Sequence, residues 1–215
     1  MATVYSIHPQ TPQTRSIEQI REALRKGAVM LYPTDTVYAI GCDLSSKIGI
    51  ERVRQIKSLS NDKPLTFLCS SLSNIANYAH VSDPAYRLIR RLIPGPYTFL
   101  LPATKLVPRL VMSPKRKTTG IRVPDHPICQ ALLQSLGNPI ISTSAPIPDD
   151  LTPRGVSQAE LFDSLEKMVD VMIEVDQPMG HQVSTMLDLT GEEPVVLRRG
   201  LGADAVEDLP MALEA

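Results

Sequence analysis

Hydrophobic positions along the chain follow two spacings, and each spacing predicts a different kind of element. Ile17, Ile20 and Leu24 lie three or four residues apart, as on one face of an amphipathic helix, and Gly27 is placed to end that helix. Similar spacings and end signals predict helices over residues 16–26, 46–59, 71–78, 82–92, 126–136 and 156–168. Helices therefore recur along most of the chain.

Short runs rich in β-branched, aromatic and other apolar residues predict the strands, because glycine, proline or polar clusters bound each run. These runs cover residues 28–32, 37–40, 65–69, 97–101, 120–123, 140–143, 171–175, 185–189 and 195–198. Strands and helices intermix without a regular βαβ rhythm, which favours an α/β protein of the α+β type: a mixed sheet flanked by helices. We find neither an internal repeat nor a linker, so a single domain over residues 1–215 is expected.

Composition is that of an ordinary globular protein, with 43% hydrophobic and 21% charged residues. No apolar run reaches the length of a membrane span, and the first residues lack a signal-peptide pattern, so no membrane partner is expected. Cys42, Cys69 and Cys129 are odd in number and far apart, which favours a reducing cytoplasm over a disulfide framework. The four histidines have no ligand spacing, so no metal held by protein side chains is expected.

Charge is distributed unevenly, although the formal net charge is only −1. Residues 84–124 contain no Asp or Glu and nine basic residues, whereas the rest of the chain holds 13 basic and 23 acidic residues. The nine are Arg87, Arg90, Arg91, Lys105, Arg109, Lys115, Arg116, Lys117 and Arg122. This asymmetry favours an anionic partner, a nucleotide or a nucleic acid; the alternative is a solvated basic surface.

Residues 32–43 combine two predicted strands with a hydroxyl-rich turn. Pro33 breaks the first run, and Thr34 and Thr36 then lie at a strand end with Asp35 between them. Binding groups often occupy such positions, because a rigid sheet edge fixes them without filling the core. The alternative is an ordinary turn between two strands, since threonine and tyrosine are good strand formers.

Further polar residues recur at strand ends along the chain. They are Thr34, Thr36, Lys57, Lys63, Thr118, Arg122, Ser142, Thr143, Ser144, Ser184, Thr185 and Arg198. Arginine offers a bidentate fork and lysine a point charge, so this set suits binding of carboxylate and phosphate. The sequence contains no GxxxxGK[ST] phosphate loop and no evident Ser/His/Asp or Cys/His pairing, and no catalytic residue is assigned. Chemistry by positioning and charge neutralisation is therefore favoured.

Three motifs occur in the order and spacing of the YrdC/YciO family: Tyr-Pro-Thr-Asp-Thr-Val-Tyr at 32–38, Thr-Thr-Gly-Ile-Arg-Val-Pro at 118–124, and Ser-Thr-Ser-Ala at 142–145. The chain resembles this family from about residue 10 to residue 200. The resemblance implies a twisted mixed sheet, flanked by helices, with a positively charged concave cleft. It also implies chemistry related to threonylcarbamoyl-AMP synthases, which use ATP, L-threonine and bicarbonate to modify a tRNA adenosine, and binding of tRNA or double-stranded RNA.

The resemblance also implies roles for particular residues. Threonine binding is implied for Thr34, Arg122 and Ser144, and nucleotide binding for Lys57, Thr118, Ser142, Ser184 and Arg198. Lys115, Arg116 and Lys117 in the basic stretch are the candidates for RNA binding. Any Mg²⁺ would enter the site bound to the phosphates of ATP. AMP is the expected nucleotide product.

Two positions depart from the synthase pattern and resemble the YciO branch instead. The Lys-x-Arg motif has Leu59 in place of arginine, and the Ser-x-Asn motif has Pro146 in place of asparagine. If the missing groups stabilise a transition state, each loss costs about 2–4 kcal/mol, a rate factor of about 10²–10³. Two main functions stay open: a synthase or a relative acting on the same intermediate, and a non-catalytic RNA- or nucleotide-binding module. A third is a retained fold with an unrelated small-molecule ligand.

Overall fold

The computed structural model describes residues 1–59, 65–113, 115–147, 156–207 and 212–213. Within these ranges, eleven strands form one mixed sheet in the order β1-β8-β2-β3-β7-β4-β6-β5-β9-β10-β11. The pairs β1/β8, β2/β8, β4/β6, β5/β9 and β10/β11 are parallel, and the remaining neighbours are antiparallel. The sequence-based prediction of a mixed sheet flanked by helices is confirmed.

The strands are β1 (Thr3–Ser6), β2 (Met30–Tyr32), β3 (Ala39–Asp43), β4 (Thr66–Leu68), β5 (Tyr97–Pro102), β6 (Thr118–Arg122), β7 (Ile140–Ser144), β8 (Val171–Glu174), β9 (Thr185–Asp188), β10 (Val195–Arg198) and β11 (Ala212–Leu213). Nine of them fall where the sequence predicts strands. The exceptions are the edge strand β1, which is only four residues long, and β11. Strand β3 begins two residues later than predicted, because Val37 and Tyr38 belong to the preceding loop.

The helices are α1 (Thr14–Arg25), α2 (Lys47–Ile56), α3 (Leu72–Tyr78), α4 (Asp83–Leu92), α5 (Pro127–Leu136), α6 (Gln158–Leu165) and α7 (Asp204–Glu207). Six of them correspond to predicted helices, and α7 was not predicted. Serine hydroxyls cap α2, α3, α4 and α6, and Gly137 ends α5 in the left-handed conformation. None of the described helices is long and apolar enough to cross a membrane.

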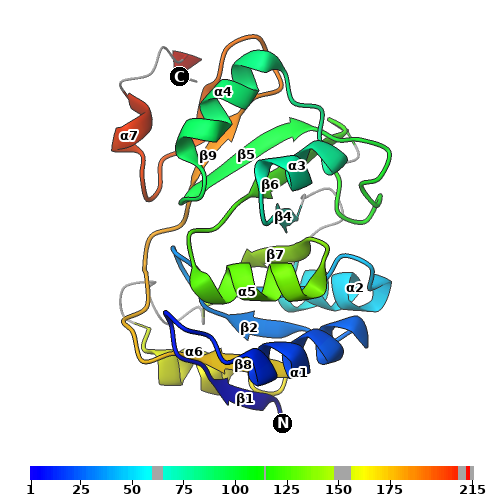
Figure 1. Ribbon diagram of the computed structural model, residues 1–215, viewed down its shortest axis with the longest axis vertical. Helices are drawn as coiled ribbons and strands as arrows, with labels where there is room; N and C mark the ends of the chain where they lie inside the picture. The colour runs from blue at the N-terminus through cyan, green and yellow to red at the C-terminus, as the bar shows by residue number, and fades with distance from the viewer. Residues whose placement is uncertain (60–64, 114, 148–155, 208–211, 214–215) are drawn as a thin grey trace.

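The helices cover the sheet in groups (Figure 1). Helices α1 and α5 pack against each other, and α2 packs on β3 and β7. In Figure 1, α1 lies in front of the part of the sheet that contains β8 and β2, and α5 lies in front of β7. Helices α3 and α4 lie in front of the part of the sheet that contains β5 and β6. The core consists of aliphatic side chains between these layers, with Tyr32, Phe67 and Phe99 fully buried on three different strands. This packing fixes the ends of β2, β6 and β7, where the candidate site lies.

Candidate functional site

The loop between β2 and β3, residues 33–38, is closed by its own hydroxyl groups. The Thr34 hydroxyl donates to the Val37 carbonyl at 2.7 Å, and the Thr36 backbone N–H donates to Thr34 Oγ1 at 3.1 Å. The two threonine hydroxyl oxygens are 3.0 Å apart. A threonine bonding the backbone two or three residues onward competes with strand pairing, which explains why Val37 is not part of β3.

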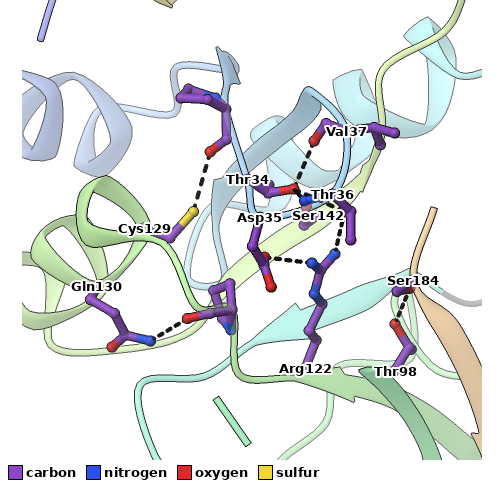
Figure 2. A network of polar contacts seen from close by, with 12 residues as sticks. Thr34, Asp35, Thr36, Val37, Thr98, Arg122, Cys129, Gln130, Ser142 and Ser184 are labelled. Carbon is purple, nitrogen blue, oxygen red and sulfur yellow. Dashed lines mark hydrogen bonds and ion pairs between the residues drawn. The ribbon is translucent and has the colours of Figure 1, made fainter. Parts of the chain in front are cut away.

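Arg122 lies at the end of β6 and reaches this loop (Figure 2). Its guanidinium donates to Asp35 Oδ1 at 2.5 Å through NH2 and to Thr36 Oγ1 at 2.9 Å through NH1. The side chains of Arg122 and Asp35 are only 9% and 11% exposed. Because the Thr34 hydroxyl already donates to Val37, hydrogen bonds run in one direction from Arg122 through Thr36 to Thr34. The guanidinium therefore orders the whole turn.

Two further contacts anchor the loop to the rest of the fold. The Cys129 thiol on α5 donates to the Pro33 carbonyl at 3.3 Å (Figure 2). The Tyr32 hydroxyl lies 2.6 Å from Ser142 Oγ on β7, and burial raises the pKa of Tyr32. A helix, a neighbouring strand and Arg122 thus hold the turn from three directions, which preorganises its polar groups.

A cavity of about 180 Å³, which we call the hydroxyl cavity, opens beside this turn. Register explains its composition, because strand residues paired across the sheet share one face: Ser142 pairs with Thr66, Leu68 with Arg122, and Met186 with Thr98. Eight of the residues singled out from the sequence line this cavity: Thr34, Thr36, Arg122, Ser142, Thr143, Ser144, Ser184 and Arg198. They come from five separate segments of the chain.

Ser184 and Arg198 form one wall of the hydroxyl cavity. Ser184 Oγ lies 2.8 Å from Thr98 Oγ1 and accepts from Arg198 NH2 at 3.1 Å, while Arg198 Nε donates to the Ser184 carbonyl at 3.1 Å. Burial lowers the pKa of Arg198, and the positive charge of Arg122 lowers it further. Two guanidinium groups therefore face the same small cavity.

Lys57 lines a second cavity of about 390 Å³, the apolar cavity, most of whose walls are aliphatic. Its ammonium group donates to Ser144 Oγ at 3.2 Å and to the Ala145 carbonyl at 3.3 Å, and burial lowers the pKa of the lysine. Val37, Ser144 and Val183 line both the apolar and the hydroxyl cavity. The two cavities are thus neighbours, with Lys57 and Ser144 at their junction.

The other residues singled out from the sequence lie elsewhere. Thr118 begins β6 and is buried, its hydroxyl has no hydrogen-bond partner among the described residues, and it does not line the hydroxyl cavity. Lys115, Arg116 and Lys117 are exposed in the preceding loop, where Arg116 lies 3.9 Å from Asp188. Lys63 falls outside the described residues. Within the described part of the chain, no group of three or more His, Cys, Asp or Glu side chains could hold a metal ion.

Residues 175–183, which follow β8, also contribute to the walls of these cavities. This segment approaches the loop very closely at Gly180, where an added Cβ would lie 1.5 Å from the Thr36 carbonyl oxygen. The backbone of Gly180 is not in the left-handed region, so glycine is required here for space alone. Only a residue without a side chain permits the 175–183 segment to rest on the loop.

Sequence reasoning assigned no role to Asp35, Thr98 or Gly180, which take part in this geometry, or to His126, which lines a further cavity beside the turn. An acidic residue between two threonines was the one available signal for Asp35. Its partner Arg122 is 87 residues away, so no local pattern could reveal the pairing. Gly180 lies in a stretch without periodicity, where its close approach leaves no trace in the sequence.

Similarity to known proteins covers nearly all of the chain. The Sua5/YciO/YrdC family model, described as "Telomere recombination", matches residues 22–200. The YciO protein of Escherichia coli (strain K12) is 43% identical over 202 residues, which cover 94% of this chain and 97% of that protein. A threonylcarbamoyl-AMP synthase of Vibrio vulnificus is 31% identical over 188 residues, 86% of this chain and 98% of the synthase.

Solved structures give the same result for the fold. The crystal structure of E. coli YciO superposes with a TM-score of 0.87 at 42% identity, covering 94% of this chain and 97% of that one. The crystal structure of P. abyssi Sua5 complexed with L-threonine superposes with a TM-score of 0.88 at 25% identity. The match covers 99% of this chain but 63% of the Sua5 chain, so this chain corresponds to part of that longer protein.

Proposed function

Because the chain belongs to the Sua5/YciO/YrdC family, we propose that it binds L-threonine and an adenine nucleotide and performs chemistry related to threonylcarbamoyl-AMP synthesis. This chemistry serves the threonylcarbamoyladenosine modification of tRNA. One observation carries the proposal: Thr34, Arg122, Ser142, Ser144, Ser184 and Arg198 line the same cavity. In this proposal the protein is an enzyme, and its substrates meet where the hydroxyl and apolar cavities join.

The hydroxyl cavity is the amino-acid end of the proposed site. Its small volume, about 180 Å³, suits a short side chain, and its hydroxyl groups suit a polar one. A substrate carboxylate pairs with Arg122, whose Nε is buried without a hydrogen-bond partner among the described residues. The crystal structure of P. abyssi Sua5 with L-threonine supports the choice of amino acid within the family.

The apolar cavity is the nucleotide end of the proposed site. Aliphatic walls suit a planar base, and two cations suit phosphate oxygens: Lys57 at the junction and Arg198 in the hydroxyl cavity. Together with Arg122 they make the proposed cleft positively charged. Mg²⁺ would enter on the phosphates of ATP, since magnesium usually binds through substrate phosphates and few protein ligands. Thr118 is the least supported of the nucleotide residues, because it does not line either cavity.

Incubation with ATP, Mg²⁺, L-threonine and bicarbonate is expected to release pyrophosphate slowly. Leu59 and Pro146 replace two groups that the synthase pattern provides, so the rate should lie about 10²–10³ below that of a synthase for each group that acts in the transition state. The double variant Leu59→Arg/Pro146→Asn is expected to be faster than the wild type. Pyrophosphate release that does not depend on threonine, or none from either protein, would contradict the enzymatic proposal.

A second candidate function is a module that binds nucleotide and structured RNA without efficient catalysis. The observation that favours it is the exposed basic cluster Lys115, Arg116 and Lys117, together with the changes at Leu59 and Pro146. Three neighbouring cations outside both cavities have no role in holding a small substrate. A tRNA or a duplex RNA that contacts them would place a sugar–phosphate backbone beside β6.

Reversal of the charges of this cluster is expected to weaken RNA binding and to flatten its salt dependence. The variant is Lys115→Glu/Arg116→Glu/Lys117→Glu. The slope of log K against log salt should fall by about one for each phosphate group that the variant no longer binds. Filter binding or fluorescence anisotropy with a tRNA over a range of salt concentrations measures this. The matched control, Arg15→Glu/Lys26→Glu/Lys167→Glu, makes the same charge change at exposed positions elsewhere. Equal losses in both triple variants would show only a net-charge effect.

A further inference from the structure

A third cavity, of about 240 Å³, adjoins the same turn, and we call it the histidine cavity. Thr34, Asp35 and Thr36 line it from the loop, His126 from the start of α5, and Gly180 from the segment after β8. It shares Thr34, Thr36 and Val37 with the hydroxyl cavity. The two cavities therefore meet at the turn, and the ion pair between Asp35 and Arg122 connects their linings.

Two buried polar atoms of the residues lining this cavity have no hydrogen-bond partner within the described part of the chain: Asp35 Oδ2 and His126 Nδ1. Buried polar groups are paired in the great majority of cases, and leaving one unpaired costs about 1–3 kcal/mol. Asp35 uses its other oxygen for Arg122, so Oδ2 is able to accept. Burial lowers the pKa of His126; Asp35 and Asp125 act to raise it, and Arg122 to lower it. The imidazole is consequently neutral at pH 7, and one ring nitrogen can accept a hydrogen bond.

We propose that Asp35 and His126 form an ammonium subsite, which receives the α-ammonium group of the amino acid whose carboxylate pairs with Arg122. Arg122 NH2 and Asp35 Oδ1 are 2.5 Å apart, so a cation and an anion already lie side by side on the protein. The carboxylate and ammonium of an α-amino acid are two bonds apart. A zwitterionic amino acid can therefore lie antiparallel to this pair, with its carboxylate beside Arg122 and its ammonium group beside Asp35. The inference rests on the proposed function and extends it.

The subsite gives the cavity a selectivity that Arg122 alone would not provide. A ligand with a carboxylate but no ammonium group would make no contact with Asp35. Its carboxylate on Arg122 would then be repelled by the nearby carboxylate of Asp35. The two accepting atoms, Asp35 Oδ2 and His126 Nδ1, are shielded from solvent. A small shift of the 33–38 loop must therefore accompany binding of the ammonium group. Protonation of His126 would place a cation beside the ammonium. Threonine affinity is therefore expected to fall once the pH drops below the pKa of His126, which burial holds under the ordinary histidine value.

Titration calorimetry at pH 7.5 with two ligands tests the subsite: L-threonine, and 3-hydroxybutyrate, which lacks the ammonium group. The wild type should bind threonine at least tenfold more tightly. His126→Phe removes the accepting nitrogen and keeps a ring, so it should lower threonine affinity about tenfold without changing the affinity for 3-hydroxybutyrate. His80→Phe, at an exposed histidine, is the matched control and should change neither. The loss of threonine affinity on acidification that protonation of His126 causes in the wild type should be absent in His126→Phe.

Each alternative outcome has a definite meaning. Equal binding of the two ligands to the wild type, or an equal loss of both in His126→Phe, would overturn the ammonium subsite and leave the proposed function standing. No binding of threonine to the folded wild type would overturn the proposed function and the subsite with it. Asp35→Asn serves as a second variant, because it also weakens the ammonium contact while keeping an oxygen that can accept from Arg122.

Discussion

Arg122→Ala is expected to lower the free energy of unfolding by about 3–5 kcal/mol, the usual cost of breaking a buried ion pair from one side. The arginine and Asp35 are almost fully buried, and removal of the guanidinium leaves the carboxylate without a partner. The substitution also breaks the chain of hydrogen bonds that runs through Thr36 to Thr34. Urea unfolding, followed by circular dichroism, measures the change as a lower midpoint.

A double variant distinguishes the buried charge from the other contacts of the arginine. Arg122→Ala/Asp35→Asn removes both charges, so it should recover a large part of the stability that the single variant loses. Arg91→Ala, at an exposed arginine on α4, is the control and should change stability by less than about 0.5 kcal/mol. If the double variant is as unstable as Arg122→Ala, the unpaired Asp35 is not the source of the loss.

Gly180→Ala is expected to destabilise the protein by about 1–3 kcal/mol and to weaken ligand binding. The new Cβ would lie 1.5 Å from the Thr36 carbonyl oxygen, so either the 175–183 segment or the turn must move. The atom it meets is backbone, which cannot swing aside as a flexible side chain could. Because this segment lines the hydroxyl, apolar and histidine cavities, the displacement should reach each of them. Thermal unfolding and threonine titration measure the two effects.

Gly191→Ala provides the matched control for this substitution. A Cβ at that position meets its nearest atom, the Glu193 carbonyl oxygen, at an ordinary 3.8 Å. The same chemical change should therefore have little effect on the unfolding midpoint or on threonine affinity. If Gly180→Ala is as harmless as Gly191→Ala, the 175–183 segment does not rest on the Thr34–Thr36 turn as the structure describes.

Most of the fold could be predicted from the sequence, because the elements carry strong local signals. The spacing of Ile17, Ile20 and Leu24 predicted α1 to within two residues at its start and one at its end, and all three are buried. The sequence was less informative where side chains bond to the backbone. Val37 and Tyr38 have strand-forming side chains, but the hydroxyl of Thr34 holds the chain in a turn through Val37. Strand β1 is a short edge strand, and its hydrophobic pattern is correspondingly weak.

The candidate site could be predicted as a set of residues but not as an arrangement. The resemblance to a family drew attention to Thr34, Arg122, Ser142 and Ser144. The sheet register brings the last three to one cavity, and the loop after β2 adds Thr34. The Asp35–Arg122 pair depends on tertiary structure, because its members are 87 residues apart. The sequence could not show that His126 Nδ1 has no hydrogen-bond partner either, because that depends on which groups the fold places around the residue.

Calorimetric titration of L-threonine into the wild type and into Arg122→Ala/Asp35→Asn tests the amino-acid site most directly. The double variant lacks both the guanidinium that pairs with the substrate carboxylate and the Asp35 charge of the proposed ammonium subsite, but it should retain the fold because neither charge of the pair is left buried without its partner. Saturable binding of threonine to the wild type and none to the folded double variant is the expected result. Equal binding to both proteins would contradict the assignment of the hydroxyl cavity, with Arg122 at its centre, as the amino-acid site.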